Sequence, residues 1–147
     1  MEQDQERYLF RWSDVKITGW IYFIEFQEKG PVKIGYATNV DKRLNNIQSS
    51  CPYELNVLCA TPGGIECEKI LHKVFADSRI RGEWFWPTRI IRMAIRRLKS
   101  FEREYPDFLP VCREMIKDKV KISLFDFYGA RPVDFEVTYK TREQMPF

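Results

Sequence analysis

The chain has 147 residues, of which 44% are hydrophobic and 31% are charged, and its formal net charge is +3. This balance is typical of one globular domain, or of one domain with an added segment, and it excludes an intrinsically disordered chain. Apolar runs such as Gly19 to Ile24 are too short to cross a bilayer, and the acidic, polar opening is unlike a secretory signal. We therefore expect a cytoplasmic protein with no membrane partner.

The first predicted structural unit is a β-hairpin that follows an irregular lead-in over residues 1–14. Aromatic and β-branched residues predominate from Trp20 to Phe26, which predicts a strand. Turn-forming residues follow, and Val32 to Tyr36 has the composition of a second short strand. Strands this close in sequence are expected to pair antiparallel.

Two helices and a third strand are predicted next. Thr38 is the expected N-cap of the first helix, with Asp41 three residues on, and apolar residues at helical spacing give it one buried stripe. Alternating apolar residues over Glu54 to Ala60 predict the third strand, and residues 61–64 are expected to form a turn before a second helix. The two predicted stripes are Val40, Leu44 and Ile47, and then Cys67, Leu71, Val74 and Phe75.

A third helix is predicted from Pro87 to about Glu104, after a loop or short strand over Arg79 to Trp86. Its apolar residues are expected on an inner face and its basic residues on an outer one. Beyond it, a short helix and one or two strands, at 121–128 and 135–140, are expected. The inner face comprises Ile91, Ala94, Ile95, Leu98 and Phe101, and the outer face Arg89, Arg92, Arg96, Lys99 and Arg103.

These elements predict an α+β fold with a small antiparallel three-stranded sheet flanked by helices. We divide the chain into an N-terminal lead-in (residues 1–16), a core domain that includes the basic helix (17–105), and a C-terminal α/β extension of unknown role (106–147).

Positive charge is concentrated between Arg79 and Lys99, where seven basic residues accompany a single acid, Glu83. A local basic patch is the footprint expected of a polyanion-binding surface, although a solvated helix face would have the same composition. The outer arginines and lysine of the third helix are candidates for phosphate contacts that do not read sequence.

Zinc is disfavoured by the cysteine and histidine pattern. The four cysteines form no CxxC pair, and His72 is the only histidine of the chain. We expect free thiols, some of them buried in the predicted stripes.

Several short motifs recur in a set order along the predicted elements. The first strand carries Ile21 and Tyr22, and the second carries Lys33, Ile34 and Gly35. Arg43 and Glu68 follow on the two predicted helices, and then come Gly82, Glu83, Trp84 and Phe85. This series resembles the GIY-YIG nuclease superfamily, and within it the phage-type branch, although the superfamily usually has Tyr-Ile-Gly in the second motif. The resemblance covers roughly residues 17 to 90 and implies the fold and chemistry of these nucleases.

The resemblance implies a site made of Tyr22, Lys33, Arg43 and Glu68. Glu68 would hold Mg²⁺ or Mn²⁺, since one or two carboxylates suffice for a hard cation that keeps water and phosphate ligands. Arg43 would pair with phosphate oxygens, and Tyr22 would deprotonate or orient the attacking water. Lys33 would add a positive contact or modulate Tyr22. His72, four residues after Glu68, is a further candidate: it would support the metal site from beside a ligand or contact a phosphate, or it forms only a local hydrogen bond.

The expected function is therefore a metal-dependent endonuclease acting on DNA. Two alternatives remain open. One is a catalytically inactive module that binds nucleic acid or nucleotide on the same fold, and the other is a phage protein-interaction factor directed at host defence. The strandedness of the DNA, and whether a homodimer or a protein partner takes part, are also open. Glu83 is expected to be structural, with Trp84 and Phe85 packing into the core.

Overall fold

The computed structural model describes residues 6–11, 17–104, 106, 108–117 and 134–139. Its main sheet has five strands in the order β4-β2-β3-β6-β5, all paired antiparallel. The strands are β2 (Gly19–Phe26), β3 (Val32–Ala37), β4 (Leu55–Gly63), β5 (Arg79–Arg81) and β6 (Trp84–Phe85). A separate two-stranded sheet pairs β1 (Glu6–Arg11) with β7 (Asp134–Tyr139).

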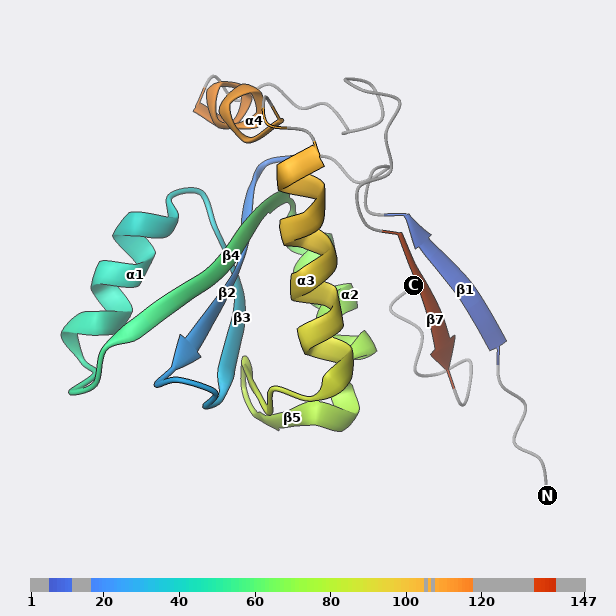
Figure 1. Ribbon diagram of the computed structural model, residues 1–147, viewed down its shortest axis with the longest axis horizontal. Coiled ribbons are helices and arrows are strands. Elements are labelled where there is room, and N and C mark those ends of the chain that lie inside the picture. The colour runs from blue at the N-terminus through green and yellow to red at the C-terminus, as the bar shows by residue number, and fades with distance from the viewer. Residues whose placement is uncertain (1–5, 12–16, 105, 107, 118–133, 140–147) are drawn as a thin grey trace.

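Helices cover both faces of the five-stranded sheet (Figure 1). One face packs on α2 (Ile65–Val74) and α3 (Arg89–Glu104), with a core that includes Ile21, Phe23 and Ile34 of the strands. The other face carries Tyr22 and Ile24 and packs on α1 (Val40–Ser49). The alternation along β2 follows from the pleat, which sends successive side chains to opposite faces. A fourth helix, α4 (Phe108–Lys117), follows α3 in the chain.

Most of the predicted elements are present. The hairpin of β2 and β3 is confirmed, with Tyr22 directly opposite Gly35. The third predicted helix is also confirmed, since all five inner-face residues of α3 are buried and all five outer-face residues are exposed. The stripe of α1 is only half-buried, because that helix lies at the surface of a small core.

Four details of the prediction are wrong. The sheet has five strands because the segment after α2 pairs with β3 through β6, where Lys33 lies opposite Trp84. Residues 61–63 extend β4 along the whole of β2, so the turn is shorter than expected. The lead-in contains β1, whose partner comes from the far end of the chain. Asn39, not Thr38, caps α1, and its side chain accepts a hydrogen bond from the Lys42 amide at 3.0 Å.

The C-terminal part contains α4 and β7, in agreement with a short helix and a strand near 135–140. The strand predicted over 121–128 lies outside the described residues. No helix in the described part of the chain is long and apolar enough to span a bilayer. The four cysteines are free thiols, of which Cys59, Cys67 and Cys112 are buried.

Candidate functional site

Gly35 in β3 leaves the space that the Tyr22 side chain of the candidate site occupies. The hydroxyl end of Tyr22 lies so close to Gly35 that a Cβ atom at this position would overlap it. The Tyr22 side chain is only 1% exposed, so it has little room to move away. A glycine opposite the tyrosine is therefore required for the phenol to lie across β3.

Glu68 enters the site from α2, beyond the short pairing of β3 with β6. That pairing stops at Lys33, and the next carbonyl oxygen, that of Ile34, lies 2.8 Å from His72 Nε2. The imidazole N–H donates this hydrogen bond, since a carbonyl only accepts. His72 thereby ties α2 to β3, one helical turn after Glu68.

His72 is oriented towards the main chain rather than towards Glu68. Its Nε2 atom is 3.9 Å from Glu68 Oε1, too far for a hydrogen bond. Burial lowers the pKa of His72, despite the Ile34 carbonyl, so the ring is neutral at pH 7. Among the described residues, no three histidine, cysteine or acidic side chains are grouped closely enough to hold a metal ion. His72 thus lies beside the site as a support for the α2–β3 contact.

Glu83 joins the site, which the sequence did not predict. Its carboxylate lies 2.9 Å from the Lys33 ammonium and hydrogen-bonds with the Glu68 side chain. The turn before β6 presents it there: Gly82 has φ = +55°, and the Gly82 carbonyl accepts a hydrogen bond from Arg79 Nε at 2.7 Å. The Glu83 carbonyl also accepts a bond from the Ile34 amide at 2.9 Å. A lone acid within the basic stretch 79–99 was the signal that could have identified it.

Lys33 is held from two sides. Besides its ion pair with Glu83, the ammonium lies 5.6 Å from the centre of the Trp84 ring, within range of a cation–π interaction. Its side chain is 18% exposed. Lys33 is therefore an ion-paired, partly buried group at the rim of the site.

The two carboxyl groups differ in their proton affinity. Burial, together with the charge and hydrogen bond of Glu83, raises the pKa of Glu68 to about 7. Burial also acts to raise the pKa of Glu83, but the hydrogen bond and charge of Lys33 outweigh it and hold that pKa below its ordinary value. A hydrogen bond between two carboxyl groups requires one proton, and Glu68 holds it.

Tyr22 and Arg43 complete the cluster. Burial raises the pKa of Tyr22 to about 12, aided by the charges of Glu83 and Glu68 and opposed by that of Arg43. The positive charge of Arg43 also acts to lower the pKa of the Glu68 carboxyl, although the Arg43 side chain is exposed on α1. Glu68 is thus within electrostatic reach of Tyr22, Lys33 and Arg43, which come from three other elements.

The basic outer face of α3 is not part of this cluster. α3 packs on the sheet face opposite to the one that carries Tyr22 and α1 (Figure 1). Its exposed surface mixes charge with apolar side chains, and Arg89, Arg92, Met93 and Arg96 line a shallow hollow of about 370 Å³. The five basic residues form a second, separate surface.

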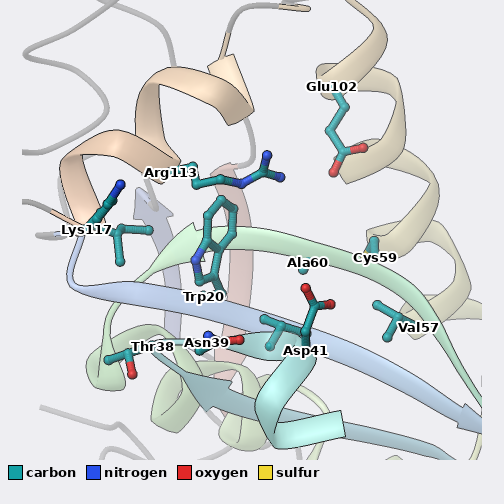
Figure 2. A pocket seen from close by; sticks show the side chains of 12 residues that line it. Trp20, Thr38, Asn39, Asp41, Val57, Cys59, Ala60, Glu102, Arg113 and Lys117 are labelled. Atoms are coloured by element: carbon teal, nitrogen blue, oxygen red, sulfur yellow. The ribbon is translucent and has the colours of Figure 1, made fainter. Parts of the chain in front are cut away.

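A cavity of about 690 Å³ lies elsewhere, between the start of α1, β4 and the helices α3 and α4 (Figure 2). The Trp20 side chain lines this cavity, together with Arg113 and Lys117 of α4 and Glu102 of α3. None of the predicted site residues lines this cavity. The candidate site is therefore separate from this cavity.

The fold and the cluster define a class: an α+β protein with helices on both faces of an antiparallel sheet and a mixed acid, base and phenol site. A family model, that of the T5orf172 domain, matches residues 19–104, more than half of the chain. The chain therefore belongs to the T5orf172 domain family. No curated protein and no solved structure matches it.

Proposed function

We propose that this protein is a metal-dependent endonuclease that hydrolyses phosphodiester bonds of DNA, with chemistry of the GIY-YIG type. The observation that carries the proposal is the convergence of Tyr22, Lys33, Arg43 and Glu68 from β2, β3, α1 and α2. The T5orf172 domain is itself associated with phage and nuclease-like proteins, which agrees with this assignment.

The donor set suits a hard divalent cation. Carboxylate oxygens are the ligands that Mg²⁺ and Mn²⁺ prefer, and Mg²⁺ usually keeps several water or phosphate ligands. Glu68 would hold the cation, since its carboxyl is 18% exposed and already close to two positive groups that suit a phosphate. A cation bound there would supply charge stabilisation to the phosphoryl group and the leaving oxygen.

The chain's own residues would orient the reactants. Arg43 can reach non-bridging phosphate oxygens from the exposed side of α1 and stabilise the charge that develops on them. Tyr22, with a pKa of about 12, is protonated at neutral pH, so its hydroxyl would orient the attacking water rather than act as a free phenolate. This choice between the two roles of Tyr22 follows from its burial.

The test is nicking of supercoiled plasmid in the presence of Mg²⁺ or Mn²⁺. We expect the wild-type chain to nick, and Glu68→Gln and Tyr22→Phe to lose activity by roughly 100-fold or more, the usual scale for removing one positioned group. Glu66→Gln, an exposed acid on the same helix, is the matched control and should keep full activity. Nicking that survives in Glu68→Gln, or in EDTA, would reject the proposed site.

One observation favours a second candidate, a nucleic-acid-binding module that does not cleave. Tyr22 is almost completely buried, and its raised pKa makes it a poor base. Binding of a DNA duplex in EDTA, without any cutting when metal is added, would identify this alternative.

The basic face of α3 would serve either function as an accessory surface. Arg89, Arg92, Arg96, Lys99 and Arg103 are all exposed, and such side chains bind phosphates without reading the bases.

A further inference from the structure

We propose that Glu83 is a positioning residue of the site. Its carboxylate holds the Lys33 ammonium next to Glu68, so that the ammonium contacts the substrate phosphate in one defined orientation. This inference rests on the proposed function. It assigns a role to a residue for which the sequence indicated only packing.

The first support is the contact geometry. The Glu83 carboxylate lies 2.9 Å from the Lys33 ammonium and also hydrogen-bonds with the Glu68 side chain. Because a lysine side chain has four rotatable bonds, an ammonium without such an anchor would sample many positions. Glu83 therefore links the groups contributed by β3 and α2.

The second support is the rigidity of the Glu83 backbone. The Glu83 carbonyl is bonded to the Ile34 amide, and the adjacent Trp84 is paired with Lys33 in the sheet. The turn that leads into it is closed by the bond between Arg79 and the Gly82 carbonyl. An anchor whose backbone is bonded to the sheet holds its partner more precisely than one on an open loop.

The third support is the position of the pair. The Glu83 side chain is 37% exposed and that of Lys33 is 18% exposed, so both can be approached by a phosphate. A partly exposed ion pair of this kind adds little to folding stability. Stability alone therefore gives a weak reason for its presence beside Glu68.

The experiment is a double-mutant cycle on DNA cleavage with Glu83→Gln, Lys33→Met and the double variant. We expect each single change to lower kcat by roughly 100-fold with little change in KM, and the double variant to be no slower than the worse single variant. Glu66→Gln is again the control. Losses that multiply in the double variant, or single variants as active as the control, would overturn the inference while leaving the nuclease proposal standing.

A charge exchange separates positioning from a structural role. The variant Lys33→Glu with Glu83→Lys restores the ion pair but moves the positive charge from β3 to the β5–β6 turn. We expect thermal stability to return to the wild-type value while kcat stays at least about tenfold lower. Recovery of both would show that the pair only stabilises the fold. A wild-type chain that cuts no DNA would remove the proposed function, and this role of Glu83 with it.

Discussion

The positions of the site residues depend on short contacts that leave little space for other side chains. Gly35 is the clearest case, because the Tyr22 hydroxyl occupies the space that any side chain at residue 35 would need. The superfamily resemblance predicted both residues from their motifs. The structure adds that the glycine is what allows the buried phenol to lie over the neighbouring strand.

Replacement of Gly35 by alanine should displace Tyr22 and destabilise the protein. The added methyl group would overlap a ring that is 1% exposed and cannot swing into solvent, at a cost of about 1–3 kcal/mol. Urea unfolding with tyrosine and tryptophan fluorescence measures this. Gly30→Ala is unsuitable as a control, because it meets the Phe26 carbonyl, so the exposed Ala76→Gly change can serve instead. Wild-type stability in Gly35→Ala would contradict the geometry.

The pKa of Glu68 predicts how folding stability depends on pH in the absence of metal. In the unfolded chain this carboxyl titrates near 4.5, whereas in the native protein its pKa is about 7. Between these values the native state binds more protons than the unfolded state, so the contribution of Glu68 to the free energy of unfolding falls as pH rises.

Relative to Glu68→Gln, the wild-type chain should therefore lose about 1 kcal/mol of stability between pH 5 and pH 8, after allowance for screening by solvent. Urea unfolding in EDTA at several pH values measures the difference, and the subtraction cancels the titration of His72. A difference that is flat across this range would contradict the raised pKa.

At the scale of elements, local sequence placed the helices and strands but not all of their ends. Both Thr38 and Asn39 are good capping residues, and Asp41 three residues after Thr38 favoured the wrong one. The tertiary register decided, because β3 continues to Ala37 and leaves Asn39 at the helix entry. Likewise, Thr61 to Gly63 have turn-like composition but pair with β2.

The cap makes a simple prediction. Asn39→Ala should remove the hydrogen bond to the Lys42 amide and lower the free energy of unfolding by about 1 kcal/mol. Thr38→Ala should have a much smaller effect, since the Thr38 side chain is not the cap. Chemical denaturation of the two variants side by side checks this, and a larger loss for Thr38→Ala would contradict the assignment.

At the scale of the whole molecule, the candidate site and the basic helix surface are built from different side chains. Tyr22 comes from the sheet face that packs on α1, whereas Glu68 comes from α2, which packs with α3 on the other face. The charged groups that shift the pKa values of Tyr22 and Glu68 include Glu83, Arg43 and Lys33, which are not on α3. We therefore expect affinity gained at α3 to be separable from chemistry at Glu68.

Arg92→Ala combined with Arg96→Ala should lower the salt dependence of DNA binding without altering the chemical step. Each lost phosphate contact reduces the slope of log K against log salt by about 0.9, so we expect a change of about 1.8, with KM raised and kcat unchanged. Lys29→Ala with Lys73→Ala removes the same charge from other elements and is the control. Loss of kcat at saturating DNA would show that α3 takes part in the site.

The sequence by itself determined the local patterns, namely the hairpin and the amphipathic α3 with its buried and basic faces. These depend on side-chain periodicity and short-range backbone preference, which a single sequence displays. The candidates Tyr22, Lys33, Arg43 and Glu68 came instead from the resemblance of their motifs to a known superfamily. Only the tertiary structure decided the pairings between distant segments, namely β3 with β6, β1 with β7, and Glu83 with Lys33 and Glu68. Such contacts depend on register and on how the chain returns to the sheet, and no local pattern specifies either.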